Sequence, residues 1–163
     1  MSWRKDPSPV ARFWLEIHDG FRRDSDGLVA LLDEHRGLDE HRRQRTAAEL
    51  AVVSGRRLES MIARLRGHHE IEDFEYFPAF RALDPKLAPG LDVLASDHAR
   101  LQRLVDEALA ARSELLATIE NDKAATPRAT DRYASRAGEL CRALTRHLHD
   151  EEELVIPLLL ERG

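Results

Sequence analysis

The chain has 163 residues, of which 42% are hydrophobic and 34% are charged. This composition is typical of one globular domain that is long enough to bury a core, so we expect a single domain over residues 1–163. The formal net charge is −5, and acidic residues are interleaved with basic ones, which argues against nucleic acid as a partner. The single cysteine, Cys141, excludes an internal disulfide, and its apolar, helical surroundings predict a small buried side chain.

The first stretch of the chain, MSWRKDPSPVARF, lacks the apolar run of a signal peptide. No segment approaches the roughly eighteen consecutive apolar residues that cross a membrane. The sequence therefore predicts a cytoplasmic protein without membrane contacts. Residues 1–8 are expected to form a flexible N-terminal segment.

A first helix is predicted to begin at Ser8-Pro9, because serine is a good N-cap and proline suits the first helical position. One face of this helix carries residues three or four apart, namely Trp14, His18, Phe21, Ser25, Leu28 and Leu32. The segment Gly37-Leu38-Asp39 interrupts the pattern and predicts a turn that caps the next helix.

A second long helix is predicted by a common seam of residues: Leu50, Leu58, Met61, Leu65, His68 and Glu72. Proline removes a backbone N–H and disfavours helix at the preceding residue. We therefore expect this helix to bend or end near Tyr76 to Phe80, around Pro78. Turns are expected at Asp84-Pro85 and at Pro89-Gly90.

Two more helices complete the pattern. The third carries Leu94, His98, Leu101, Val105, Ala108, Leu115 and Ile119 on one seam. After a predicted loop from Asn121 to Thr130, which contains Pro127, the fourth carries Tyr133, Ala137, Leu140, Leu144, His147, Glu151, Leu154 and Leu158. Nothing alternates with a period of two, so no strand is predicted. Four amphipathic helices with short connections indicate an all-α, up-down-up-down four-helix bundle.

Two distant stretches, HHEIEDFEYFP and HLHDEEELVIP, repeat one motif. Each has a histidine, a glutamate four residues later and a proline six residues after that: His68, Glu72 and Pro78 in the first, and His147, Glu151 and Pro157 in the second. An isolated histidine precedes each pair, His18 by fifty residues and His98 by forty-nine. The chain is therefore a near-repeat built on residues that commonly bind metals.

These histidines and glutamates are predicted to meet at one depth of the bundle. In an up-down bundle, the starts of the first and third helices lie beside the ends of the second and fourth. At about 1.5 Å per residue, all six fall roughly 12–18 Å from one end, and they share the apolar seams. Residues four apart lie on one helical face, roughly 5–6 Å apart at Cβ, so each His-x-x-x-Glu pair can bind one ion or bridge two.

Buried ionisable groups need partners, and two divalent cations would satisfy all six residues at once. Nitrogen and carboxylate ligands without thiolates favour iron, with manganese or zinc as alternatives. We predict metal ligation by His18, His68, Glu72, His98, His147 and Glu151. The remaining isolated histidines, His35, His41 and His149, are interpreted as hydrogen-bonded core residues or as exposed ones. A ferritin-like site is excluded, because no histidine follows a glutamate by three residues.

The chain resembles the hemerythrin-like, or HHE cation-binding, family over essentially its whole length. The resemblance rests on IHDGFR around His18, SDHARL around His98, and the two repeated stretches with their His-x-x-x-Glu pairs. It implies a four-helix bundle around a carboxylate-bridged, non-haem di-iron centre that reacts with dioxygen or related small oxidants. Such proteins are associated with oxygen binding, with iron or redox sensing, and with peroxide or nitric oxide handling.

The chain departs from oxygen-carrying hemerythrins at two points. Those proteins have two histidines four apart on the third helix, whereas here Leu94 and Gln102 stand four residues before and after His98. Their carboxylate on the fourth helix comes five residues after its histidine, whereas Glu151 comes four after His147. The sequence is therefore more similar to the sensor or enzyme-like branch.

The internal repeat suggests a centre with approximate two-fold symmetry. In this hypothesis His18 and His68 hold one ion, His98 and His147 hold the other, and Glu72 and Glu151 bridge them. Each ion then keeps open positions, which favours reaction with peroxide or nitric oxide over oxygen carriage. His69 is the candidate for an additional ligand, because the adjacent position is a carboxylate in some relatives. Tyr76, one turn after Glu72, is a candidate for lining the pocket.

The predicted function is that of a di-iron protein that binds or reacts with a small oxidant: dioxygen, peroxide or nitric oxide. The alternative is a non-enzymatic iron or redox sensor that acts through a partner protein, in which loss of the metal loosens the bundle. A third hypothesis is a structural bundle that binds zinc adventitiously or binds no metal.

Overall fold

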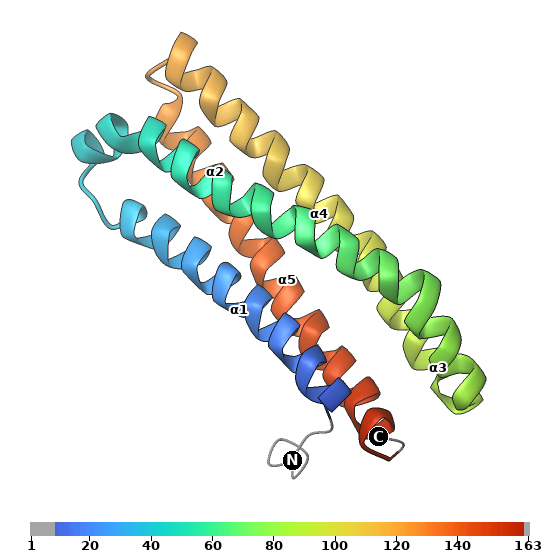
Figure 1. The fold of residues 1–163 in the computed structure, drawn as a ribbon. Coiled ribbons are helices and arrows are strands. Elements are labelled where there is room, and N and C mark those ends of the chain that lie inside the picture. The colour runs from blue at the N-terminus through green and yellow to red at the C-terminus, as the bar shows by residue number, and fades with distance from the viewer. Residues whose placement is uncertain (1–8, 162–163) are drawn as a thin grey trace.

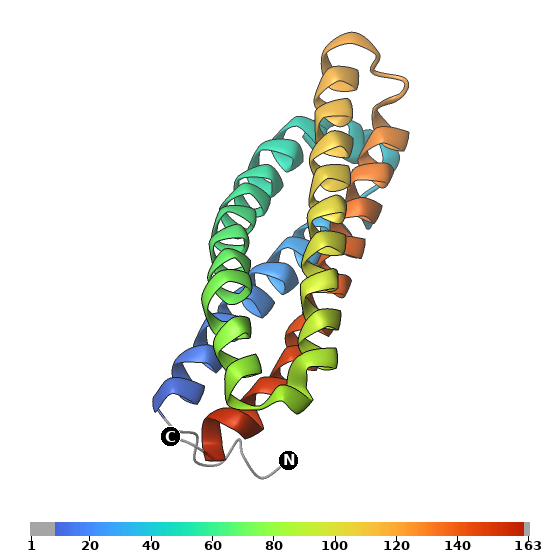
Figure 2. The same cartoon turned by 90° about the vertical axis from the view of Figure 1, so that its right-hand side faces the viewer.

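The predicted all-α bundle is confirmed by a computed structural model, which describes residues 9–161. Four long helices run up and down beside one another (Figures 1 and 2). They are α1 (Pro9–Arg36), α2 (Glu40–Ile71), α4 (Ala88–Asn121) and α5 (Thr126–Glu161). The predicted cap Ser8 and the segment 1–8 lie outside the described residues. Across residues 9–161, no helix combines the length and the apolar character needed to cross a membrane.

The two ends of the bundle carry different parts of the chain. The start of α1 and the end of α5 lie at the same end as the link that leads into α4, and the α1–α2 and α4–α5 links lie at the other end (Figure 1). The predicted turn at residues 37–39 is confirmed. Asp39 caps α2 by accepting a hydrogen bond from the Arg42 backbone N–H at 3.0 Å.

The regular register of the second helix ends at Ile71, shortly before the expected bend or end near Tyr76 to Phe80. A π-helical turn, η2 (Glu72–Tyr76), follows α2 directly, and a short helix, α3 (Phe77–Leu83), follows η2. The Phe77 N–H bonds to the Glu72 carbonyl, five residues back. The irregular turn thus precedes Pro78, which lies in the first turn of α3, and helical backbone continues to Leu83. Proline is tolerated there because the wider π turn has already changed the hydrogen-bond register.

The predicted turn at Asp84-Pro85 is present, but the one at Pro89-Gly90 is wrong. Asp84 accepts a hydrogen bond from the Lys86 N–H and begins a 3-10 turn, η3 (Pro85–Leu87). Pro89 and Gly90 instead lie in the first turn of α4. Proline costs nothing there, because N–H groups in the first helical turn have no intrahelical partner.

The predicted loop from Asn121 to Thr130 is shorter than expected for the same reason. Only residues 122–125 lie between the helices, and Pro127 is in the first turn of α5. The second motif proline, Pro157, lies inside α5, which continues to Glu161.

The core consists of two clusters of buried apolar side chains. The larger cluster includes Leu58 and Leu140, and also Cys141, whose predicted burial is confirmed. Burial raises the pKa of the Cys141 thiol to about 11, so the thiol is protonated at neutral pH. The smaller cluster includes Trp14 and Phe77 and lies toward the end where α1 begins. The histidines and glutamates of the repeated motif lie in sequence between members of these two clusters.

Candidate metal centre

Seven ionisable residues from the four long helices and η2 form one layer between the two apolar clusters, which we call the polar layer. Its members are His18 on α1, His68 and His69 on α2, Glu72 in η2, His98 on α4, and His147 and Glu151 on α5. Glu72, Glu151 and His18 have no exposed surface. The structure thus brings together all six predicted ligands and the predicted candidate His69.

The polar layer divides into two groups whose potential ligand atoms all lie within 4.8 Å of one another. One group is His18, His68, Glu72 and Glu151, and the other is His69, Glu72, His98 and His147. Glu72 belongs to both groups, so its carboxylate is placed to join two ions. The groups differ in composition, because one has two imidazoles and the other has three.

The two oxygens of Glu72 face opposite groups. Oε1 lies 2.8 Å from Nε2 of His68, and Oε2 lies 3.4 Å from Nε2 of His98. Glu151 is also placed between groups, since its Oε2 lies 3.6 Å from Nε2 of both His18 and His147. Both carboxylates therefore have the positions expected of bridges between two cations.

Two carboxylates outside the polar layer orient two of its histidines. Nδ1 of His18 lies 3.1 Å from Glu152 Oε1, and Nδ1 of His98 lies 2.9 Å from Asp73 Oδ1. When these imidazoles are neutral, Nδ1 donates to the carboxylate, so the lone pair is on Nε2 and points into the layer. Metal-binding histidines characteristically donate their second ring N–H to a carboxylate in this way.

Several buried polar atoms of the layer lack a hydrogen bond of good geometry from the described residues. They are both carboxylate oxygens of Glu72 and of Glu151, Nε2 of His69 and of His98, and both ring nitrogens of His147. Buried polar groups in native proteins are nearly always hydrogen-bonded. A cluster of ring nitrogens and carboxylate oxygens without such bonds suits cations, so the residues present fit the metal that the donor set implies.

Burial holds His68, His69, His98 and His147 in their neutral, metal-binding form. It lowers the pKa of His68 to about 4, of His147 to about 3 and of His69 to about 2, and the neighbouring histidines lower the last two further. Burial also lowers the pKa of His98, although the hydrogen bond to Asp73 opposes this effect. At neutral pH these imidazoles therefore offer lone pairs without first losing a proton.

The bridging carboxylates show the opposite effect. Burial raises the pKa of Glu72 to about 8. Burial and the adjacent Glu72 carboxylate raise the pKa of Glu151 well above its usual value. Two buried carboxylates side by side resist ionisation unless a positive charge lies between them. A divalent cation would replace the protons they hold and relieve this repulsion.

Comparison with known proteins agrees with this geometry. The family model of the hemerythrin HHE cation-binding domain matches residues 10–159. The chain belongs to the hemerythrin HHE cation-binding family. Membership of this family implies cation binding, typically of iron, and the two ligand groups described above could hold metal. Searches of curated proteins and of solved structures found no match.

His69 lies in the same half of the polar layer as His98. Its ring stacks on that of His98, with centroids 3.8 Å apart and an interplanar angle of 10°. The third helix lacks a second histidine, because Leu94 and Gln102 stand four residues to either side of His98. His69 brings a third imidazole to that half of the layer from α2 instead.

The prediction that Tyr76 lines the pocket is not supported by the geometry. Tyr76 is 37% exposed and its ring lies 5.0 Å from that of Trp14. Phe77 takes the inward position, with its ring 5.5 Å from that of His98. The physical reason is the π turn, which places the next inward residue five positions after Glu72, where an α-helix would place it four after.

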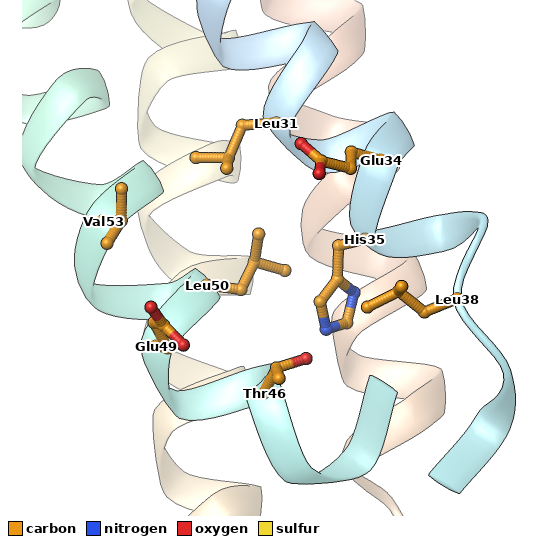
Figure 3. A pocket seen from close by; sticks show the side chains of 8 residues that line it. All are labelled: Leu31, Glu34, His35, Leu38, Thr46, Glu49, Leu50 and Val53. Carbon is orange, nitrogen blue, oxygen red and sulfur yellow. The ribbon is translucent and has the colours of Figure 1, made fainter. Parts of the chain in front are cut away.

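The three histidines interpreted as ordinary residues lie outside both ligand groups. His41 and His149 are exposed. His35 is buried and donates through Nε2 to the Arg43 carbonyl at 3.1 Å, as expected of a core histidine. It also lines a separate pocket of about 240 Å³ beside the α1–α2 link (Figure 3).

The residues that sequence reasoning missed are Asp73 and Glu152. A signal for them was present, because both repeated stretches carry an acidic residue five positions after their histidine. Their partners could not be read from that spacing. Asp73 follows the glutamate of the first half but binds the isolated histidine of the second half, and Glu152 does the reverse.

Proposed function

We propose that the polar layer holds two iron ions and that the loaded protein reacts with a small oxidant such as peroxide, nitric oxide or dioxygen. The observation that carries this proposal is the convergence of lone pairs on two sites that share Glu72. Nitrogen and oxygen donors without a thiolate favour iron, and manganese and zinc are the competing metals.

The residues in and around the polar layer have different roles in holding the metal. Imidazoles of the two groups would hold each ion and Glu72 and Glu151 would join the ions, while the carboxylates of Asp73 and Glu152 hold the rings of His98 and His18 in place. When bound, ferrous iron supplies the electrons that a small oxidant accepts. Five imidazoles and two carboxylates do not saturate two ions, so positions remain open to a small molecule.

The size of the reacting molecule is limited by burial. Both glutamates and His18 have no exposed surface, and the apolar clusters close the layer from above and below. A diatomic molecule or peroxide fits this limit. This supports reaction with small oxidants.

A second candidate is an iron or redox sensor, which the same burial supports. Unpartnered carboxyls and imidazoles make the metal-free layer costly, so loss of metal should loosen the bundle. A partner protein could then distinguish the loaded from the empty state. In this case the protein would hold iron without turning over an oxidant.

The test begins with protein expressed with iron and purified without oxygen. Metals per chain are counted, and visible spectra are recorded before and after addition of peroxide and of nitric oxide. Two iron ions per chain and a spectral change with either oxidant are expected. Near-absence of iron would contradict the proposal, and iron that is inert to both, with a fall in stability on chelation, would favour the sensor.

The ligand set is tested with matched variants. His68→Ala and Glu151→Ala should each lower the metal content, because each removes a donor from a buried group that no described neighbour replaces. His149→Ala is the control, since His149 is exposed on the same helix as Glu151. Full metal content in both ligand variants would show that the ligand set is wrong.

A further inference from the structure

The two halves of the polar layer are shielded from solvent to different degrees. On one side, His18 is fully buried and its orienting residue Glu152 has a side chain that is 1% exposed. Nη2 of Arg22 lies 2.7 Å from Glu152 Oε1, so a guanidinium closes this side from outside. Arg22 is itself held by Asp19 at 3.1 Å.

The other side reaches the surface. The side chain of Asp73, which orients His98, is 38% exposed. Asp73, His69 and His98 line a surface hollow of about 370 Å³ between α2–η2 and α4. Arg66 and Gln102 form part of its wall and are hydrogen-bonded to each other at 3.3 Å. No arginine is placed on Asp73 in the way that Arg22 is placed on Glu152 among the described ion pairs.

His68 does not open a second route of the same kind. Its side chain is 12% exposed, but its Nε2 is turned inward, 2.8 Å from Glu72 Oε1. The rings of Phe21 and Trp14 pack against it with centroids 5.3 and 6.3 Å away. The exposed part of His68 is therefore not the atom that would bind a metal.

We infer that the two ions of the centre are kinetically inequivalent: the ion held by His69, His98 and His147 exchanges through the hollow, and the ion held by His18 and His68 is trapped. Asp73 is the positioning residue that retains the exchangeable ion, and Glu152, locked by Arg22, retains the other. This inference rests on the proposed binding of two ions, but not on their reaction with an oxidant.

The physical reason lies in the two orienting hydrogen bonds. Removing such a partner of a metal-binding histidine typically weakens metal affinity by about 10- to 100-fold. Water competes for an exposed carboxylate and weakens its hydrogen bond, whereas a buried, charge-paired carboxylate keeps its full strength. The ring of His98 can therefore turn away from its ion more readily than that of His18, and the hollow lets water or a chelator take its place.

Release of zinc to an excess of a coloured chelator tests the inference without any oxidant. Protein loaded with two zinc ions should release them in two phases of equal size. If the rate of zinc binding is unchanged, an affinity loss of about 10- to 100-fold in Asp73→Ala should accelerate the fast phase by the same factor. Asp73→Asn should be intermediate, and neither variant should change the slow phase. Glu152→Gln should accelerate the slow phase only. Glu70→Gln is the control, because Glu70 lines the same hollow without orienting a ligand.

A second variant tests the route without touching an orienting hydrogen bond. Ala99 is exposed and lines the hollow, so Ala99→Leu should narrow it and slow the fast phase alone. Release in a single phase, or an Asp73 effect on both phases, would overturn the inference. Failure to bind two metal ions, whether zinc or iron, would overturn it together with the proposed function. Two bound iron ions that ignore every oxidant would contradict the proposed function and leave this inference standing.

Discussion

The two halves of the bundle bury polar groups in different ways. In the larger apolar cluster, the Tyr133 hydroxyl donates to Ser54 Oγ at 2.9 Å, and Ser54 Oγ donates to the Leu50 carbonyl at 2.6 Å. Both hydroxyls there have a partner from the chain. In the polar layer, by contrast, both oxygens of Glu72 and of Glu151 are buried among imidazoles without a hydrogen bond of good geometry from the described residues.

This difference separates what the chain stabilises alone from what needs a cation. The cluster around Tyr133 is complete without a ligand, so it can hold the four helices together in the metal-free protein. The polar layer is completed only when a positive charge enters. Variants in the larger apolar cluster should therefore change stability without changing metal content, whereas variants in the polar layer should change metal content.

The largest effect is expected from Glu72→Gln. Glu72 belongs to both ligand groups, so the variant should lose most of its metal, as counted after dialysis. The metal-free variant should nevertheless be more stable than the metal-free parent, by a margin that grows as pH rises from 4.5 to about 8, because burial raises the pKa of Glu72 to about 8 in the folded state. Urea unfolding of both metal-free proteins measures this gain. Retention of two ions by the variant would refute the bridging role.

His69→Ala should have the next largest effect on metal content, and it tests the difference between the two ligand groups of the polar layer. It removes one of three imidazoles from the group that contains His98. We expect metal content to fall from two ions towards one per chain, with the bundle still folded by circular dichroism. His41→Ala is the matched control, since His41 is an exposed histidine on the same helix. An unchanged metal content would show that His69 is not a ligand, and that His98 and His147 are the only imidazoles that bind the ion in that group.

The free energy of unfolding of the metal-free protein should depend on pH through both the glutamates and the histidines of the polar layer. The pKa of Glu72 rises from 4.5 to about 8, so the folded state binds more protons than the unfolded state in this range and loses stability as pH rises through it. The pKa of His68 falls from 6.5 to about 4, so the unfolded state binds more protons there and stability falls as pH drops.

These two opposing trends make the upper part of the pH range informative. From pH 6.5 to about 8 the carboxyl effect acts without the His68 effect, and the metal-free protein should become less stable. The zinc-loaded protein should not, because the cation replaces the proton. Urea unfolding across this range compares the two forms, and parallel curves would argue against a buried cation site.

The smallest effect is expected from Tyr133→Phe in the apolar half. Loss of the hydrogen bond to Ser54 should lower the free energy of unfolding by about 1 kcal/mol. Metal content and the spectrum of the iron-loaded protein should not change. A loss of metal in this variant would show that metal binding in the polar layer depends on the larger apolar cluster.

Much of the architecture follows from spacing along the chain. Apolar residues three and four apart define the inward face of each helix, and His68 with Glu72, four apart, must share that face. Because helices of similar length with short links pack antiparallel, His18 and His98 had to meet the ends of α2 and α5. These local rules were sufficient to predict the bundle and the convergence of its six histidines and glutamates.

Only the tertiary structure decided which side chains on different helices become hydrogen-bond partners. Periodicity tells which face a residue occupies but not which side chain lies opposite, so the pairing of Asp73 with His98 and of Glu152 with His18 was not predictable. The π turn shifted the inward position from Tyr76 to Phe77, because an i to i+5 hydrogen bond replaces the regular register. Local spacing determined the chemistry of the layer, and packing between helices determined its asymmetry.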